Sequence, residues 1–420
     1  MKIDILLGLQ WGDEGKGKIV DAISPDYDII ARFQGGPNAG HSLEFNNFKH
    51  ILHIIPSGIF HKDKINIIGN GVVIDPAVFA KEIKTLGLPV EELVKRLIIS
   101  AKANLILPSH RILDAAYEFS MGNTKIGSTL KGIGPTYTDK IARKGLRAGE
   151  ILRSDFHELY KYRLKEHLII LKNHGFQYDL NEYEDGWFEG VEILKKFRIV
   201  HTEYLINDLI ASGKKLLAEG AQGTMLDIDF GSYPYVTSSN TISAGACTGL
   251  GVSPKKVGEV LGIFKAYCTR VGSGPFPTEL NDATGDKLRD RGCEYGSTTG
   301  RPRRCGWLDM PALKYAIMIN GVTKLFMTKS DVMSGFSTIK VCMSYKSGSK
   351  EFSEIPFDNI KLEPVYTELP GWQEDISQIR DFEKLPANLK GYIKFIEDQT
   401  GTPITLVSVG PDRQETIFRM

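Results

Sequence analysis

The chain has 420 residues, of which 42% are hydrophobic and 25% are charged, a composition typical of globular domains and unlike that of disordered or fibrous chains. Its 52 basic and 51 acidic side chains leave a formal net charge of +1, which gives the whole chain no electrostatic attraction to nucleic acid or to an anionic membrane. No window approaches the roughly 20 apolar residues that span a bilayer, and the apolar run at the N-terminus is too short for a signal peptide. The five cysteines form no C-x-x-C pair, so we predict a cytoplasmic protein with reduced thiols.

The first predicted element is a buried strand at 3–9, and a glycine-rich turn separates it from a helix that begins near Lys18. This β–loop–α unit is the usual start of a doubly wound sheet. A helix at 76–86 ends before Gly87, and the segment 156–212, which is poor in Gly and Pro, is predicted to hold several helices. Further strands are predicted at 65–68 with a continuation at 72–74, and at 216–220, 260–264 and 324–327.

No repeat and no Pro/Ser-rich linker divides the chain. We therefore predict a single domain over residues 1–420, of α/β class, with a large, mostly parallel central sheet, flanking helices and insertions. The 43 glycines concentrate in a few short segments, which is typical of loops that let the backbone approach a ligand closely, although plain turns also use glycine. These segments are 8–17, 35–40, 122–149, 220–251 and 292–306.

Residues 10–18 read Gln-Trp-Gly-Asp-Glu-Gly-Lys-Gly-Lys and contain the pattern G-x-x-x-x-G-K, whose backbone N–H groups and lysine bind phosphates. The pattern normally continues with a Ser or Thr that reaches Mg²⁺, but Ile19 follows here. Asp13 offers a carboxylate inside the same loop and is the candidate for the missing ligand, because Mg²⁺ binds carboxylate oxygens. The alternative is a glycine-rich turn with solvated lysines; the position between a strand and a helix favours the phosphate loop.

Two segments carry a resemblance to a known family. Residues 10–18 resemble the N-terminal signature of adenylosuccinate synthetases, and 132–147, Gly-Ile-Gly-Pro-Thr-Tyr-Thr-Asp-Lys-Ile-Ala-Arg-Lys-Gly-Leu-Arg, resemble the second signature of that family. The likeness extends from residue 8 to the segment Pro411-Asp412-Arg413. It implies a P-loop-like GTP-binding architecture and the GTP-dependent ligation of IMP and L-aspartate to adenylosuccinate, with GDP and phosphate released. The reaction would pass through 6-phosphoryl-IMP and would be the first committed step of AMP synthesis from IMP.

The resemblance also implies four catalytic residues, Asp13, Lys16, His41 and Gln222. Asp13 would take the proton from N1 of IMP, so that O6 can attack the γ-phosphate of GTP. His41 would act as the general acid toward the departing GDP with a near-neutral pKa, while Lys16 balances charge. Gln222 would hold the edge of the hypoxanthine ring. Mg²⁺ would be bound by the carboxylate of Asp13 and the carbonyl oxygen of Gly40.

The sequence Thr-Lys-Ser-Asp at 328–331 follows a predicted strand and resembles the guanine-reading N-K-x-D element of GTPases. Asp331 can accept hydrogen bonds from N1–H and N2–H₂ of guanine, whereas adenine has no such pair of donors. The residues expected to bind GTP are Gly12, Asp13, Glu14, Gly15, Lys16, Gly17, Lys18, Gly40, His41, Ser42, Arg303, Lys329, Ser330, Asp331, Ser408, Val409 and Gly410.

A basic segment at 301–304 offers arginines, whose guanidinium groups bind carboxylates in a bidentate manner. It has no interleaved aromatic residues and the chain has no excess of basic charge, which argues against an RNA-binding patch. The residues expected to bind aspartate are Ser297, Thr298, Thr299, Gly300, Arg301, Pro302 and Arg303. Those expected to bind IMP are Asp13, Glu14, Gly15, Lys16, Asn38, Ala39, Gly40, His41, Thr129, Arg143, Gln222, Thr237 and Arg301.

Arg143 would reach across a two-fold interface to IMP in the partner's site, so the resemblance implies a homodimer. The chain departs from the usual family pattern at Pro37, Leu130 and Ser330, among other positions. Most of the eight histidines other than His41 stand in stretches without an evident partner and are expected to be surface or core residues.

Three other classes of function are alternatives to this one. A regulatory GTPase would share the phosphate loop and the 328–331 element, but it would leave Asp13, His41 and the arginine segment unexplained. Another amide-forming ligase or nucleotide kinase would use a different acceptor, and one that prefers ATP would not need Asp331. A non-catalytic homologue that binds nucleic acid or a protein partner would have no need of the catalytic residues.

Overall fold

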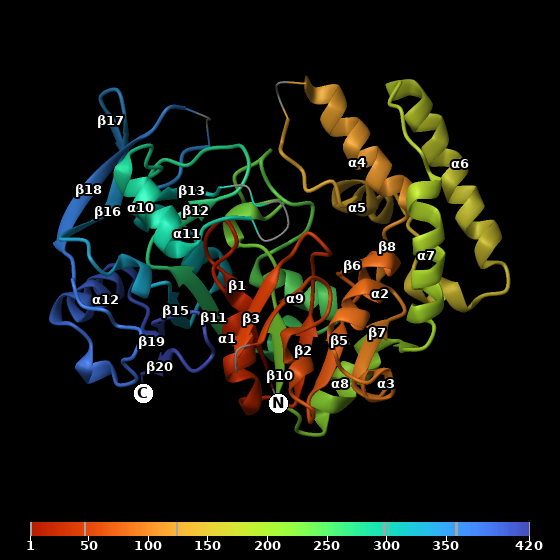
Figure 1. The fold of residues 1–420 in the computed structure, drawn as a ribbon, viewed down its shortest axis with the longest axis horizontal. Helices are drawn as coiled ribbons and strands as arrows, with labels where there is room; N and C mark the ends of the chain where they lie inside the picture. Colours follow the sequence, from red (N-terminus) through yellow and green to blue (C-terminus); the bar gives the residue numbers. More distant parts are fainter. Residues whose placement is uncertain are drawn as a thin grey trace.

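The structure, a computed structural model, describes residues 2–45, 48–122, 125–296, 300, 302–357 and 360–419. A ten-stranded sheet with the order β20-β19-β15-β11-β1-β10-β2-β5-β7-β9 forms its centre (Figure 1). Neighbouring strands pair in parallel, except that β19 and β20 are antiparallel. This arrangement confirms the predicted α/β class with a large, mostly parallel sheet. The strands are β1 (Ile3–Gly8), β2 (Ile29–Arg32), β5 (Ile65–Ile68), β7 (Leu97–Ser100), β9 (Arg198–Val200), β10 (Leu216–Glu219), β11 (Val257–Lys265), β15 (Lys324–Thr328), β19 (Ile404–Ser408) and β20 (Thr416–Phe418).

The central strands are apolar because both faces of the sheet are covered. Along β1, Ile3, Ile5 and Leu7 pack into one core cluster. Leu6 points to the opposite face and packs in a second cluster with Ile19 of the first helix. This alternation follows from the two-residue period of a strand, and burial on both faces explains why β1 reads as a nearly continuous apolar run.

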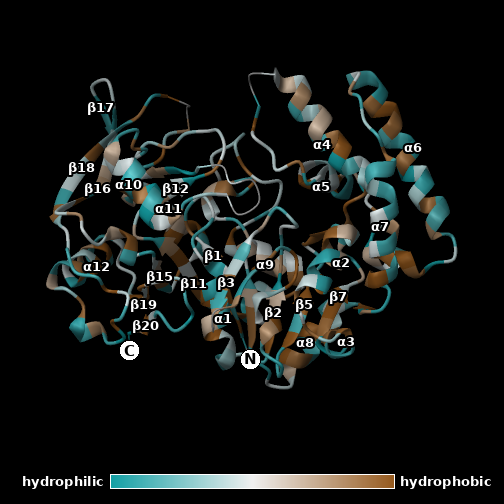
Figure 2. Ribbon diagram, in the orientation of Figure 1, coloured by the Kyte–Doolittle hydropathy of each residue, from teal (hydrophilic) through white to brown (hydrophobic). Residues whose placement is uncertain are grey.

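Helices cover the sheet and extend beyond it (Figure 1). Together α4, α5, α6 and α7 form a helical region beside the β5–β7 end, whereas α10 and α11 lie toward the β15 end. Figure 2 shows β5 and β7 largely brown and α10 largely teal, as expected for covered strands and an exposed helix. The helices are α1 (Lys16–Ile23), α2 (Pro76–Thr85), α3 (Val90–Arg96), α4 (Pro108–Met121), α5 (Ile133–Ile141), α6 (Phe156–His174), α7 (Asn181–Leu194), α8 (Thr202–Ala211), α9 (Ser243–Leu250), α10 (Ala283–Gly292), α11 (Met310–Asn320) and α12 (Ala387–Thr400).

Four smaller sheets carry the insertions. Two are antiparallel pairs, one is a parallel pair, and the fourth extends the molecule beside α10 (Figure 1). Their strands are β3 (His41–Phe45) with β4 (Phe48–Leu52), β6 (Val73–Ile74) with β8 (Asn104–Leu105), β12 (Cys268–Arg270) with β13 (Arg304–Gly306), and β14 (Leu308–Asp309) with β16 (Thr338–Ser347), β17 (Lys350–Phe352) and β18 (Glu363–Pro370).

Two of the predicted elements differ from the structure. The expected continuation of the 65–68 strand is wrong, because Val73–Ile74 pairs with β8 in a separate sheet. The turn before it packs so tightly on α9 that a Cβ on Gly69 would lie 2.5 Å from the carbonyl oxygen of Gly249, and the chain leaves the main sheet there. The segment 156–212 does contain helices, but the short edge strand β9 interrupts them. Among the described residues, none of the helices is long and apolar enough to cross a membrane.

Candidate active site

Loops that follow β1, β2, β10 and β15 leave the same edge of the central sheet and meet there. The loop after β10 touches the loop after β1 so closely that a Cβ on Gly223 would lie 2.7 Å from the nitrogen of Gly12. Thr328, at the end of β15, donates its hydroxyl hydrogen to the carbonyl of Glu14 (2.7 Å). Ligands of open α/β sheets bind outside the carboxyl ends of the strands, and most of the predicted site residues lie there.

The phosphate loop connects β1 to α1 and is shaped by an internal carboxylate. Gly12, Asp13 and Gly15 all have positive φ (89°, 61° and 87°), so the loop needs glycine at two of these positions. The fully buried Glu14 accepts hydrogen bonds from the backbone nitrogens of Gln10 (3.1 Å) and Gly12 (2.9 Å), and it also pairs with the ammonium of Lys16. Glu14 therefore organises the loop from within and holds Lys16 against it.

Arg303 joins two carboxylates of the site. Its Nε lies 2.8 Å from Oδ2 of Asp13, and its Nη1 donates to Oε2 of Glu294 (2.7 Å). Asp13 is about one-third exposed, whereas Glu294 is fully buried. The structure thus brings the predicted base and a predicted ligand-binding arginine into direct contact.

Glu294 was not predicted, and it is the anchor of this contact. It accepts hydrogen bonds from the ammonium of Lys265 (3.2 Å) and the hydroxyl of Tyr267 (2.6 Å), both of which are buried. Burial alone would raise the pKa of Glu294, but the cations Lys265, Lys329 and Arg303 outweigh it and bring the pKa to about 2. Its carbonyl also accepts the backbone N–H of Arg303 (2.8 Å), so residues 294 and 303 close the base of the intervening loop.

His41, at the start of β3, lies against Glu219 at the end of β10. Its Nδ1 is 2.5 Å from Oε1 of Glu219, whose carboxylate also accepts from the backbone nitrogen (2.8 Å) and hydroxyl (2.6 Å) of Ser57. The Nε2 of His41 is buried and has no hydrogen-bond partner among the described residues. A buried carboxylate that accepts the Nδ1 proton leaves Nε2 free for a ligand.

The expected near-neutral pKa of His41 differs from what the structure gives. Burial, and then the positive charge of Arg32, lower the pKa of His41 to about 4, although the hydrogen bond to Glu219 acts in the opposite direction. At pH 7 the imidazole is therefore neutral. Negative charge close to Nε2, such as that of a phosphate, would raise this pKa.

Two more predicted residues present buried polar atoms without partners. Both amide atoms of Gln222 and the side-chain oxygen of Asn38 are buried, and none has a hydrogen-bond partner in the described part of the chain. Gln222 has a positive φ of 55°, a strained conformation for a residue other than glycine. Since buried polar atoms are almost always hydrogen-bonded, these amides indicate a polar ligand.

Lys18 contacts the C-terminal loop rather than the phosphate loop. Its ammonium donates to the hydroxyl of Ser408 (2.6 Å) and to the carbonyls of Gly410 (2.5 Å) and Glu415 (3.0 Å). Burial lowers the pKa of Lys18 to about 8. Lys18 would therefore contribute to GTP binding by holding the loop that contains Ser408, Val409 and Gly410.

The 328–331 element lies beside that same loop. Ser330 donates its hydroxyl hydrogen to the carbonyl of Ser408 (2.5 Å), and Lys329, with a φ of 61°, donates to the carbonyl of Gly292 (2.7 Å). Asp331 is partly exposed, and burial raises its pKa from the usual value. A carboxylate between two ordered loops suits recognition of a planar base.

Several other predicted residues take no part in the contacts described above. Thr129, Arg143 and Ser42 are exposed, and Thr237 is half-buried. Arg143 has a φ of 64°, and its guanidinium has no hydrogen bond or ion pair with the described residues. The predicted residues Ser297, Thr298, Thr299 and Arg301 lie outside the described residues.

The expectation that the remaining histidines lack partners is wrong for several of them. His61 pairs with Asp21 (2.9 Å), and both His110 and His167 bond to Asp139. These partners are 28 to 40 residues away in the chain, so the local sequence does not show them.

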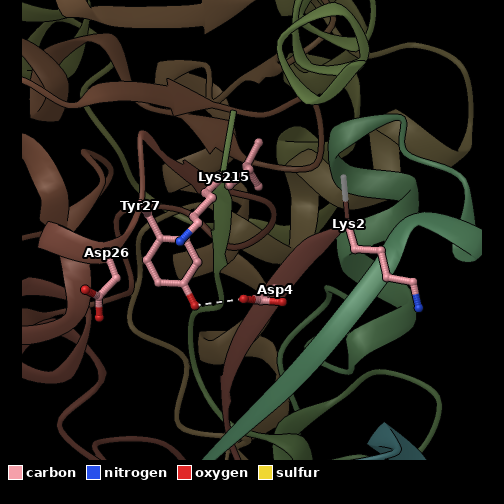
Figure 3. Close-up of a pocket in the computed structure, with 6 residues that line it drawn as sticks. Lys2, Asp4, Asp26, Tyr27 and Lys215 are labelled. Atoms are coloured by element: carbon pink, nitrogen blue, oxygen red, sulfur yellow. Dashed lines mark hydrogen bonds between the residues drawn. The ribbon is translucent and has the colours of Figure 1, made fainter. Parts of the chain in front are cut away.

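A separate pocket of about 250 Å³ lies at the amino edge of the sheet, away from the site (Figure 3). It is lined by residues at the starts of β1 and β10 and by Asp26 and Tyr27, and the Tyr27 hydroxyl donates to Asp4 (2.9 Å). None of the predicted site residues lines it.

A phosphate loop after the first strand of a mostly parallel sheet, with a histidine, carboxylates and an arginine at the same edge, defines a nucleotide-binding enzyme of the phosphate-loop class. The family model for adenylosuccinate synthetase matches residues 5–417. The chain belongs to the adenylosuccinate synthetase family, whose members are ligases.

Relatives and solved structures agree with this membership. The chain is 60% identical over 420 residues to an adenylosuccinate synthetase of Bacteroides fragilis and 59% identical to one of Porphyromonas gingivalis, with 100% of this chain and 99% of each relative covered. The fully ligated adenylosuccinate synthetase of Plasmodium falciparum superposes with a TM-score of 0.94 at 41% identity, covering all of both chains. A succinoaminodeoxyadenylate synthetase of cyanophage S-2L shares the fold, with a TM-score of 0.65 at 21% identity, covering 99% of this chain and 95% of that one.

Replacing Glu219 by glutamine tests the Glu219–His41 contact. Loss of the anion that fixes the His41 tautomer is expected to lower kcat about 100-fold, with the KM for GTP changed little, in steady-state assays. The control is Glu184→Gln in α7, because the half-buried Glu184 accepts a hydrogen bond from the hydroxyl of Tyr160 (2.8 Å) that an amide oxygen can still accept. Equal losses in the two variants would contradict the role of Glu219.

Proposed function

We propose that the residues at the carboxyl edge of the sheet carry out the family's reaction in two chemical steps. The reaction is the GTP-dependent ligation of IMP and L-aspartate to adenylosuccinate, with release of GDP and phosphate, in the synthesis of AMP. One observation supports the assignment of this site above all: Asp13 projects from an organised phosphate loop that packs against His41 and Gln222, both of which have unpartnered buried atoms.

In the first step, Asp13 takes the proton from N1 of IMP and O6 attacks the γ-phosphorus of GTP, giving 6-phosphoryl-IMP and GDP. An amide oxygen is a weak nucleophile until the neighbouring N–H is deprotonated, which is why a base is needed. The backbone of residues 12–17 and Lys16 hold the phosphates, and they offset the negative charge that spreads over the transferred group. Phosphoryl transfer is governed by positioning and charge, and the preformed loop supplies both.

His41 serves the same step from the opposite side. Glu219 holds its Nδ1 proton, so Nε2 is the atom that faces the phosphoryl group and donates a hydrogen bond once it is protonated. The unpartnered amide of Gln222 is suited to the donor and acceptor atoms of the hypoxanthine edge, and Asn38 offers a further acceptor.

Mg²⁺ is the proposed metal. Asp13 and the carbonyl of Gly40 offer the oxygen donors that it prefers, and the Asp13 carboxylate is partly exposed toward the loop. When bound it would neutralise charge on the phosphates of GTP. Because Arg303 already contacts Oδ2 of Asp13, the arginine and the cation would have to share this carboxylate.

In the second step, the amine of aspartate attacks C6 and displaces the phosphate, giving adenylosuccinate. The residues proposed to bind the aspartate carboxylates are 297–303, and the base of that loop is closed by the contacts between Glu294 and Arg303. Thr129, Thr237 and Arg143 are proposed to bind the phosphate of IMP. Asp331 is proposed to select guanine, with Lys329, Ser330 and residues 408–410 beside the base.

At the level of the whole molecule, we propose a single functional unit over residues 1–420, located in the cytoplasm and active as a homodimer. The support for the dimer is the position of Arg143, whose guanidinium is exposed and makes no bond or ion pair with the described residues of its own chain. An arginine so placed is available to a second copy.

The first test follows the purine absorbance of IMP with purified protein, GTP, aspartate and Mg²⁺, omitting each component in turn. The signal is expected to require all four, and Asp13→Asn is expected to lower kcat at least about 100-fold because the base is lost. Asp63→Asn, which changes an exposed carboxylate outside the site, is the control. Consumption of GTP without IMP and aspartate would identify a GTPase instead.

A second test concerns the choice of base. Asp331→Asn is expected to raise the KM for GTP about tenfold or more, because one of two paired hydrogen bonds to guanine is lost. The variant should accept xanthosine triphosphate better than the parent, since the new amide can donate to the oxygen at C2. The KM for IMP should be unchanged. A variant with an unaltered preference for GTP would refute the role of Asp331.

A third test concerns the homodimer. At an IMP concentration near the KM of the parent, Asp13→Asn and Arg143→Leu are each expected to show little activity, whereas co-expression of the two should restore about a quarter of the parent activity, because half of the two-fold dimers are mixed and contain one intact site. Co-expression of two differently tagged Asp13→Asn chains is the control. No recovery in the mixed sample would show that each chain uses its own Arg143.

A further inference from the structure

A buried His–Asp–His cluster connects three helices of the helical region. Asp139 of α5 accepts hydrogen bonds on Oδ2 from Nε2 of His110 in α4 (3.1 Å) and from Nε2 of His167 in α6 (2.9 Å). Both histidines are buried, and the Asp139 side chain is 14% exposed. Burial raises the pKa of Asp139, but the two histidines outweigh it and hold the pKa well below its usual range.

The hydrogen bonds fix the protonation of the cluster. The backbone N–H of Leu107 donates to Nδ1 of His110 (2.9 Å), so the His110 proton is on Nε2 and points at Asp139. Ser109 lies 2.7 Å from Nδ1 of His167 and can donate there in the same way. Burial lowers the pKa of His110 to about 4, which agrees with a neutral ring.

The same bonds argue against a metal ion, although the three ligand atoms lie within 4.8 Å of one another. To bind a cation through Nε2, His110 would have to move its proton to Nδ1. That nitrogen already accepts the Leu107 N–H, so the move would set two donors against each other. The cluster is built to hold a carboxylate in place.

The backbone of Asp139 holds the turn that carries Arg143. Its carbonyl accepts the N–H groups of Lys144 (2.8 Å) and Gly145 (3.1 Å), and the backbone N–H of Arg143 donates to the carbonyl of Lys140 (3.2 Å). Arg143 has a φ of 64°, a strained conformation for a residue other than glycine that persists only where the surroundings enforce it. Gly145 is fixed in turn, because a Cβ there would lie 2.1 Å from Oδ1 of Asn104.

We propose that Asp139, held by His110 and His167, is a positioning residue that aims Arg143 at the phosphate of IMP. The side chain of Asp139 ties α5 to α4 and α6, while its carbonyl closes the turn in which Arg143 projects from the surface. This inference rests on the proposed function, in which Arg143 contacts IMP bound to the other subunit.

The test compares Asp139→Asn, Arg143→Leu and the double variant in the full-length enzyme. Asp139→Asn can keep an oxygen where Oδ2 lies, but it removes the charge to which both histidine N–H groups donate, and neutral hydrogen bonds are weaker than charge-assisted ones. The KM for IMP is therefore expected to rise about tenfold or more, while the KM values for GTP and aspartate change less than about twofold. If Asp139 acts only through Arg143, the double variant should be no worse than Arg143→Leu alone. The matched control is Glu166→Gln, which changes a half-buried carboxylate paired with Lys144 and Arg163 and should leave all three KM values near those of the parent.

A second pair of variants covers the case in which Asp139→Asn does not fold. His167→Leu removes one N–H donor, whereas His167→Gln keeps an N–H that can reach Asp139, so the glutamine variant should restore the KM for IMP. Additive effects in the double variant, or equal rises in all three KM values, would overturn the positioning role. An Arg143→Leu variant with a normal KM for IMP would instead refute the proposed contact of Arg143, and this inference with it.

Discussion

The parallel pairing of β1 with β10 on one side and β11 on the other is the constraint on which the site depends. Parallel sheets occur almost only where both faces are covered, and a crossover must join one parallel strand to the next. The loops that follow these strands therefore all begin at the same edge of the sheet. The phosphate loop, Glu219 and Thr328 are placed at that edge by register alone. The nucleotide chemistry is therefore located by backbone hydrogen bonds before any site side chain contributes.

Buried charges then fix the loops relative to one another. Glu14, Glu219 and Glu294 are all fully buried carboxylates, and each has a cation or a histidine as partner as well as hydrogen-bond donors. Taking an unpaired charge out of water costs several kcal/mol. Removal of one partner therefore leaves the other as a buried charge without compensation. The Glu14–Lys16 pair orders the phosphate loop itself, whereas the Glu219–His41 and Glu294–Arg303 pairs restrict where one segment can lie against another. Such restriction is the condition for holding reacting atoms in register.

The arrangement around Asp13 shows how one arginine can serve two states. Arg303 is shared between the partly exposed Asp13 and the fully buried Glu294. If Asp13 turns toward substrate or a cation, Glu294 still holds the guanidinium, because Lys265 and Tyr267 keep that carboxylate in place. Asp13, the proposed base, can thus be released without loss of order in the arginine.

The sequence by itself determined the β–loop–α start, the phosphate loop and the strands β1, β5, β10, β11 and β15 of the central sheet, because these depend on short-range patterns. It also determined membership of the family, because the two signatures are long. It also singled out Asp13, His41, Gln222 and Asp331 as candidates. Only the tertiary structure showed Glu219 beside His41, 178 residues away, and Glu294 beside Arg303. It alone showed that His110 and His167 share Asp139, and that β6 leaves the main sheet. The physical reason is that a buried carboxylate reads in a sequence like any surface acid, and its role is decided by which distant donors the folded chain brings within about 3 Å.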